Sequence, residues 1–192
     1  MADTHSVLDQ PSGWVARFVP LIAPGEVLDL ACGGGRHARL LAGTGHQVLA
    51  VDRDASALER VAGEGIRTLQ HDLENAPDGL ASWPFEANRF AGIVVTNYLH
   101  RPLFGHILSS LAPGGVLIYE TFARGNERFG KPSNPDFLLA PGELLAAMHG
   151  DPSLRVIAYE DGFVSLPKPA MVQRICAVKT SAGRAPELLR LD

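Results

Sequence analysis

The stretch Val27-Leu-Asp-Leu-Ala-Cys-Gly-Gly-Gly-Arg-His-Ala38 decides the fold of this chain. A short apolar run that contains Asp29 leads into a cluster of glycines, and a helix-like segment follows from Arg36. A second apolar run, Val48-Leu-Ala-Val-Asp52, then ends in a carboxylate. This order of strand, tight turn, helix and strand predicts the first unit of a parallel α/β sheet that holds a nucleotide-like cofactor.

Two cofactor classes fit such a turn. The segment from Gly33 to Ala38 matches the dinucleotide fingerprint G-x-G-x-x-A, and Asp52 follows at a suitable distance to bind ribose hydroxyls. Asp29 favours the other class, because a carboxylate repels a pyrophosphate but attracts the ammonium and sulfonium groups of S-adenosylmethionine. His71-Asp72 closes the third expected strand, where an adenine ring would lie. The sequence therefore favours the methyl donor.

Size and composition predict one soluble domain. The chain has 192 residues, 46% of them apolar, which suits a single domain over 1–192 with a core of about 11–180. The net charge of −4 argues against a large nucleic-acid surface. The two cysteines have no paired spacing, so we expect neither disulfides nor a metal site, as in a reducing cytosol. Because no apolar run approaches the ~18 residues of a membrane span, we expect a cytoplasmic protein that does not enter a membrane.

The hydrophobic pattern predicts how the sheet is built. The link 161–170 is Pro-rich and too short for a crossover helix, so the two strands that it joins should be antiparallel. The fold class is an α/β, Rossmann-like doubly wound sheet of about seven strands, mostly parallel with an antiparallel closing hairpin. Strands are expected over 27–30, 47–51, 66–71, 90–96, 116–121, 154–160 and 172–179. Helices are expected within 11–20, over 36–42, from Asp54 or Ser56 to 62, over 102–111 and over 141–150. A sharp turn is expected over 112–115, a loop with a short helical turn over 74–89, and a weakly helical tail from 182.

Taken together, these motifs resemble those of the class I S-adenosylmethionine-dependent methyltransferases, over roughly 11–179. The chain departs from their first motif only in having Ala31 where glycine is common. The compact layout around Phe137-Leu-Leu-Ala-Pro-Gly-Glu-Leu144 is similar to the tellurite-resistance-type branch. The matching segments are Asp29–Gly35, Asp52, His71-Asp72-Leu73, Phe90–Asn97 and Leu111–Ile118.

The resemblance implies a cofactor site at the strand ends, which yields S-adenosylhomocysteine as product. Asp29 would orient the amino group of S-adenosylmethionine, Asp52 would accept from the ribose hydroxyls, and Asp72 or Leu73 would contact adenine. Cys32 lies inside the turn, where no substrate fits, and is expected to fill space there. The implied cofactor-binding set is Asp29, Ala31, Cys32, Gly33, Gly35, Asp52, Arg53, Asp72, Leu73, Asn97 and Tyr98.

Methyl transfer from a sulfonium is an in-line displacement, to which an enzyme contributes mainly alignment and exclusion of water. A base is needed only for a nucleophile that starts protonated. Tyr98, His100 and Tyr119 are the catalytic candidates near the expected methyl position. Because Tyr119 and Glu120 alternate along a strand, only one of them can face the cofactor.

The segment after the fifth expected strand supplies candidate substrate residues. Phe122, Arg124 and Arg128 lie where substrates approach open α/β sheets, and they favour an anionic or aromatic small molecule. A solvated polar loop is the alternative. Asn97-Tyr-Leu-His100 departs from the Asn/Asp-Pro-Pro-aromatic motif of adenine methylation, and no cysteine is placed for attack on a pyrimidine.

We therefore predict a methyltransferase for a small-molecule acceptor, with no nucleic-acid partner; a protein side chain stays open as the acceptor. The alternatives are a small NAD(P)-dependent oxidoreductase and a non-catalytic cofactor-binding protein. The chain lacks the Tyr-x-x-x-Lys pair that the first alternative would need.

Overall fold

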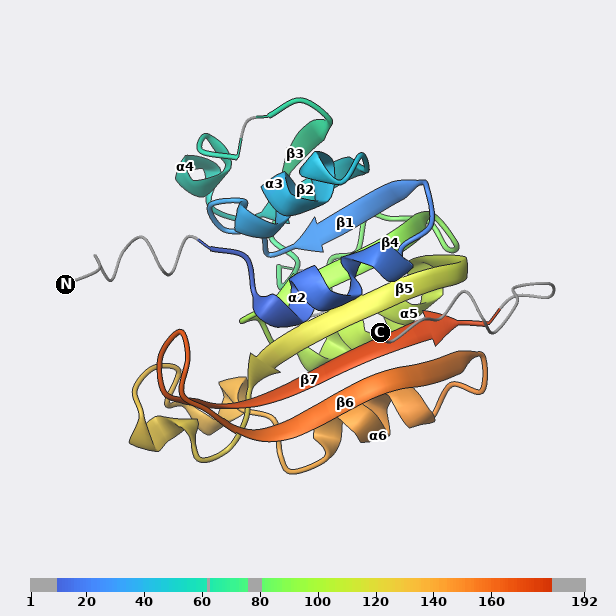
Figure 1. Ribbon diagram of the computed structural model, residues 1–192. Helices are drawn as coiled ribbons and strands as arrows, with labels where there is room; N and C mark the ends of the chain where they lie inside the picture. Colours follow the sequence, from blue (N-terminus) through green and yellow to red (C-terminus); the bar gives the residue numbers. More distant parts are fainter. Residues whose placement is uncertain (1–9, 62, 76–80, 181–192) are drawn as a thin grey trace.

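One mixed sheet runs through the computed structural model, which describes residues 10–61, 63–75 and 81–180 (Figure 1). Its strand order is β3-β2-β1-β4-β5-β7-β6, and only the last two strands run antiparallel to their neighbours. This confirms the predicted fold class. The strands are β1 (Glu26–Leu30), β2 (Gln47–Asp52), β3 (Ile66–Gln70), β4 (Phe90–Thr96), β5 (Leu111–Phe122), β6 (Leu154–Val164) and β7 (Ala170–Lys179).

The order of the strands reverses at β1, which pairs in parallel with both β2 and β4. The carboxyl ends of the five parallel strands therefore meet at one edge of the sheet, with a crevice at the reversal point. β7 is antiparallel to β5, and β6 is antiparallel to β7. The hairpin tip, residues 165–169, consequently lies at this same edge.

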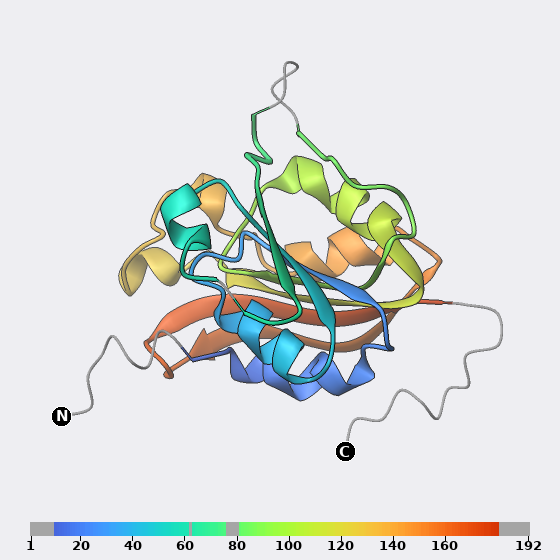
Figure 2. The same ribbon diagram turned by 90° about the horizontal axis from the view of Figure 1, so that it is seen from above.

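Helices cover both faces of the sheet, α2 and α3 on one face and α5 and α6 on the other (Figure 2). The α-helices are α2 (Gly13–Phe18), α3 (Arg36–Gly43), α4 (Ala55–Leu58), α5 (Phe104–Ser110) and α6 (Glu143–His149). The 3₁₀ turns are η1 (Val19–Leu21), η2 (Arg101–Leu103), η3 (Asn126–Arg128) and η4 (Pro135–Phe137).

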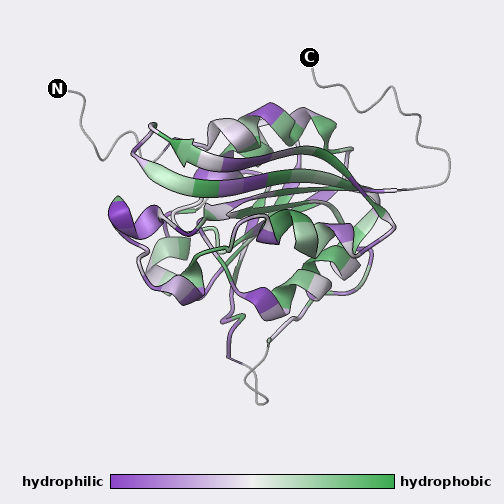
Figure 3. Ribbon diagram, turned by 90° about the horizontal axis from the view of Figure 1, so that it is seen from below, coloured by the Kyte–Doolittle hydropathy of each residue, from purple (hydrophilic) through white to green (hydrophobic). Residues whose placement is uncertain are grey.

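The central strands are apolar because both of their faces are covered. All but one of the residues of β4 are buried, and Figure 3 shows hydrophobic residues concentrated in the central strands. Strand alternation sends Leu28 and Leu30 toward α5 and sends Val27 toward α2 and α3. Asp29 lies two residues after Val27 and so points to the same face of the sheet, which directs its carboxyl group into an apolar layer.

Some expected boundaries were wrong. The segment 112–115, expected to be a sharp turn, is part of β5, because Leu111 already pairs with Phe90 of β4. The pairing of the two strands shifts in register between Phe90 and Gly92. Gly115 allows this close approach, since a Cβ there would lie 2.9 Å from the Phe90 carbonyl oxygen. Both closing strands are longer than expected, which shortens their link to 165–169.

Near the glycine turn, Asp54 caps α4 as expected, accepting from the amide of Ser56 at 2.9 Å. The helix ends at Leu58, four residues earlier than predicted. The expected helical turn within 74–89 is absent from residues 74–75 and 81–89, the part that the structure describes. The expected tail from 182 lies outside the described residues.

Candidate functional site

The glycine turn between β1 and α3 has an irregular backbone that leaves amide groups at the sheet edge. Ala31, Gly33 and Gly35 all have positive φ angles, of 52°, 52° and 74°. A Cβ on Gly35 would lie 2.7 Å from Val61, so this position requires glycine for both conformation and space. Ala31 adopts the same left-handed conformation at some cost in strain, which is characteristic of functional sites.

Asp52 at the end of β2 holds this turn in place. Its Oδ2 accepts from the amide of Gly33 at 2.8 Å, and its Oδ1 accepts from the amide of Asp54 at 2.9 Å. A carboxylate can accept about four hydrogen bonds, so Asp52 keeps capacity toward the cleft that it lines. One side chain thus both shapes the turn and presents oxygen atoms beside it.

Asp29 lies beneath the turn and is only 1% exposed. Its Oδ2 has no hydrogen-bond partner among the described residues. Burial raises the pKa of this carboxyl group to about 7, although the Ala38 amide and the Arg36 charge oppose the rise. A buried oxygen without a partner costs free energy, so it marks a place where a cationic ligand group would be stabilised.

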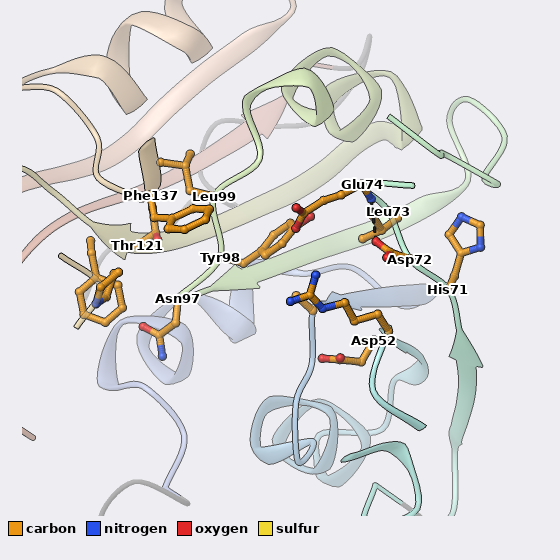
Figure 4. A pocket seen from close by; sticks show the side chains of 14 residues that line it. Asp52, His71, Asp72, Leu73, Glu74, Asn97, Tyr98, Leu99, Thr121 and Phe137 are labelled. Atoms are coloured by element: carbon orange, nitrogen blue, oxygen red, sulfur yellow. Dashed lines mark hydrogen bonds between the residues drawn. The ribbon is translucent and has the colours of Figure 1, made fainter. Parts of the chain in front are cut away.

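A cleft of about 420 Å³ opens at the carboxyl ends of β1 to β5, and we call it the first cleft. In Figure 4, Tyr98 lies between the acidic residues Asp52, Asp72 and Glu74 on one side and Asn97 on the other. The lining residues are Ala31, Asp52, Arg53, His71, Asp72, Leu73, Glu74, Asn97, Tyr98, Leu99, Thr121, Phe122, Pro132 and Phe137.

The two tyrosines near the cleft are held as hydrogen-bond donors. Burial and the neighbouring Glu74 carboxylate, to which the Tyr98 hydroxyl donates, raise the pKa of Tyr98 far above its ordinary value. Tyr119 is 1% exposed, and its hydroxyl donates to the Tyr98 carbonyl oxygen at 3.0 Å. Burial likewise raises the pKa of Tyr119. Both phenols therefore stay protonated, so neither is prepared to remove a proton.

A second cleft, of about 540 Å³, adjoins the first and shares Asn97 and Phe122 with it. Asn97 stands at this junction with a φ of 56°, and its amide donates to the Glu120 carbonyl oxygen at 2.9 Å. The remaining lining residues of the second cleft are Gln10, Pro11, Ser12, Gly13, Trp14, Arg36, Glu120, Val164, Leu166, Pro167, Lys168, Ala170, Val172 and Arg174.

One wall of the second cleft is fastened by Ser12, just before α2. The Ser12 amide donates to Nε2 of His37 at 3.0 Å, and the Ser12 hydroxyl donates to Glu120 at 3.2 Å. Burial lowers the pKa of His37 to about 3, so its ring is neutral and Nδ1–H can donate to Thr96, 3.2 Å away. Arg174 pairs with Glu120 at 2.5 Å. The cleft wall is therefore rigidly attached to α3, β4 and β5.

The structure brings most of the expected cofactor residues together. Asp29, Cys32, Gly33 and Gly35 form or underlie the turn without lining the first cleft as described. Phe122 lines both clefts, while His100 and Tyr119 line neither among the described residues. The expected residues that line the first cleft are Ala31, Asp52, Arg53, Asp72, Leu73, Asn97, Tyr98 and Phe122.

Arg124 and Arg128 are exposed and line neither described cleft. The chain turns away after Phe122, because Ala123 pairs with Leu139 and the Arg124 amide donates to the Leu139 carbonyl at 2.9 Å. Their role in substrate binding stays a prediction, and neither side chain lines a described cleft.

The sequence reading missed Trp14, Glu74, Lys168 and Arg174 as site residues. Of these, Lys168 had a usable signal: in an antiparallel hairpin that closes a parallel sheet, the tip must lie at the carboxyl edge. Trp14 and Arg174 carried no such signal. They come together only because α2 packs against the β5–β7 side of the sheet.

Comparison with known proteins identifies the family. A family model for the methyltransferase domain matches residues 5–150. Protein-L-isoaspartate O-methyltransferase from Chlorobaculum tepidum is 36% identical over 102 residues, which are 53% of this chain and 46% of that protein. The chain thus matches about half the length of this curated relative. We conclude that the chain belongs to the methyltransferase domain family.

Solved structures agree on the fold. TehB from Haemophilus influenzae superposes with a TM-score of 0.72 at 18% identity, covering 88% of this chain and 63% of that one. The 1,6-didemethyltoxoflavin-N1-methyltransferase of Burkholderia thailandensis, solved with S-adenosylhomocysteine, gives 0.62 at 19% identity, covering 88% and 76%. The family confirms the predicted enzyme class and its S-adenosylmethionine cofactor over the dinucleotide alternative, and the TehB likeness is consistent with the tellurite-resistance-type layout.

Proposed function

We propose that this protein transfers the methyl group of S-adenosylmethionine to a small-molecule acceptor. The observation that carries the proposal is the buried Asp29 oxygen that lacks a partner beneath the glycine turn. S-adenosylmethionine carries an ammonium group that such an oxygen would bind. A dinucleotide would instead bring a pyrophosphate toward the same buried carboxyl group, which ionised Asp29 would repel.

The other residues around the turn suit the rest of the cofactor. Asp52 offers free acceptor capacity for ribose hydroxyls, and the Asp72–Leu73 segment lines the far end of the first cleft, where adenine would lie. When bound, S-adenosylmethionine supplies an electrophilic methyl group. The chain's own residues bind and orient it, and the apolar side chains of Leu73, Leu99 and Phe137 limit access of water.

The acceptor is best assigned to the second cleft. It meets the first cleft at Asn97 and Phe122, so a molecule held there would approach the methionine end of the cofactor. A volume of about 540 Å³ suits a small molecule. The bound small molecule in the Burkholderia enzyme is compatible with such an acceptor.

Three broader expectations belong to the same proposal. The described elements share one sheet, which supports treating residues 1–192 as a single methyltransferase domain. Cys32 and Cys176 are both free and buried, which supports a cytoplasmic setting. No described helix is long and apolar enough to cross a membrane. The net charge of −4 supports an acceptor other than nucleic acid.

Calorimetry with S-adenosylhomocysteine tests the cofactor assignment. We expect micromolar-range binding that Asp52→Ala weakens by about a hundredfold, because a ribose contact is lost together with the bonds to the amides of Gly33 and Asp54. Glu64→Ala, which removes an exposed carboxylate, is the control and should change nothing. Binding of NADH without binding of S-adenosylhomocysteine would contradict the proposal.

A further inference from the structure

The two described residues that both clefts share, Asn97 and Phe122, carry no group that takes up a proton at neutral pH. His71 is bonded to Ser82 through Nε2, and the Asp72 carboxylate accepts from the Glu74 amide at 3.0 Å. Glu74 holds the Tyr98 hydroxyl, and Asp52 holds the glycine turn.

The last proton acceptor among the described lining residues, Glu120, is engaged as well. Its Oε2 accepts from Ser12 and pairs with Arg174. The carboxylates that line the two clefts thus hold protein groups in place, and the residues that both clefts share supply no base. This favours an acceptor whose nucleophilic atom is already ionised at neutral pH.

The charge of the second cleft points in the same direction. Among the described lining residues, Lys168 and Arg174 are cationic beside one carboxylate, Glu120, with which Arg174 pairs. Lys168 Nζ lies 5.9 Å from the ring centroid of Phe122, one of the two residues that both clefts share. A positive charge therefore stands close to the point where the acceptor atom must lie.

The remaining surface of the cleft is apolar. Trp14 and Phe122 contribute aromatic rings, and the hairpin contributes the aliphatic walls of Val164, Leu166 and Val172. Leu166 lies at the hairpin tip and is 77% exposed. A cleft with apolar walls and an exposed cation beside Phe122 fits an acid with an apolar, ring-sized body.

We propose, resting on the methyltransferase function above, that the acceptor is an apolar small acid methylated on its ionised atom, with Lys168 as the residue that selects the charge. The ionised oxygen or sulfur forms a bond to the methyl carbon of the sulfonium donor, and the electron pair of the broken carbon–sulfur bond stays on sulfur. The negative charge of the acceptor and the positive charge of the sulfonium cancel, so both products are neutral at the reacting atoms and no proton is moved.

Binding of matched probes tests the selection of charge. We would titrate 2-naphthoate and its neutral twin 2-naphthamide into the protein by calorimetry, with and without saturating S-adenosylhomocysteine. The acid should bind about tenfold more tightly than the amide, and Lys168→Gln should abolish most of this difference without changing the affinity for S-adenosylhomocysteine. Arg155→Gln removes an exposed cation on β6, outside both clefts as described, and should leave the difference intact.

The rate of methyl transfer tests the missing base. Naphthalene-2-thiol and 2-naphthol differ in acidity, as cysteine and tyrosine do. The rate for each should rise about tenfold per pH unit up to the pKa of the probe itself, because the enzyme removes no proton.

The outcomes separate the two proposals. If S-adenosylhomocysteine does not bind, the proposed function fails, while the acid-against-amide comparison still tests the cleft of the free protein. Equal affinity for acid and amide, or no binding of either, overturns the inference. So does a 2-naphthol rate that ignores the pKa of the probe. If Arg124→Gln or Arg128→Gln loses the preference for the acid while Lys168→Gln keeps it, the inference is overturned and the substrate site lies at the loop after β5.

Discussion

Asp29 should couple cofactor binding to pH. In the free protein, burial raises the pKa of its carboxyl group from the ordinary 3.8 to about 7. Between these two values the folded protein keeps a proton that the unfolded chain has released. The free energy of unfolding therefore falls as the pH rises through this window, by up to about 4 kcal/mol at 1.36 kcal/mol per unit.

The ammonium group of the cofactor should reverse this penalty. An ammonium beside the unpartnered oxygen favours the ionised carboxylate, so binding below pH 7 has to expel the proton of Asp29. We expect the affinity for S-adenosylhomocysteine to rise about tenfold per pH unit up to about pH 7 and then to level off. At pH 6, binding should release about one proton, measured by calorimetry in two buffers of different ionisation enthalpy.

Asp29→Asn supplies the matched control. The amide cannot ionise, so the pH dependence of binding should disappear and the affinity at pH 8 should fall about tenfold or more. The same variant should be about 1–3 kcal/mol more stable to denaturant at pH 8. Removal of the buried charge stabilises the folded protein, and the unpartnered amide group that replaces it offsets part of this gain. Binding without proton release at pH 6, or a variant that is less stable than the wild type at pH 8, would refute this account of Asp29.

Three further predictions follow from the same contacts. Asp52→Asn should weaken S-adenosylhomocysteine binding less than Asp52→Ala does, because the remaining carbonyl oxygen can keep one bond of the turn; calorimetry on both variants decides this. Gly35→Ala should lower the unfolding free energy by about 2–4 kcal/mol through positive φ and the clash with Val61, and Val61→Ala in the same chain should restore only part of it in urea titrations. Tyr119→Phe should cost about 1 kcal/mol of stability, for the lost bond to Tyr98, and should leave the pH–rate profile unchanged, since a shifted profile would make Tyr119 a base.

Much of the first cleft was predictable because its determinants are local. Glycines that permit positive φ, an apolar run that ends in a carboxylate and a capping residue such as Asp54 act over a few residues, so their order in the chain reports the turn directly. An almost wholly apolar run likewise identified β4 to the residue. The boundaries of β5 and α4 were not predictable in the same way, because pairing with Phe90 and contacts with neighbouring elements decide where they end.

The roles of the tyrosines depended on long-range packing. Tyr119 and Glu120 are neighbours in sequence, yet strand alternation buries the first against α5 and directs the second to the second cleft. Which of the two faces a ligand cannot be read from their residue types. The contact of Tyr119 with the Tyr98 carbonyl, which joins β5 to the segment after β4, shows the same dependence on the sheet.

The amino-acid sequence by itself determined the succession of strands, the glycine turn and the class of cofactor, because each shows in patterns of a few neighbouring residues. Only the tertiary structure decided what faces the acceptor. Trp14, Glu120 and Lys168 come from three distant segments that meet because β7 runs antiparallel beside β5 and returns the hairpin tip to the carboxyl edge. Local sequence patterns encode backbone geometry. A binding surface is formed by distant segments, and only the pairing of strands brings these segments together.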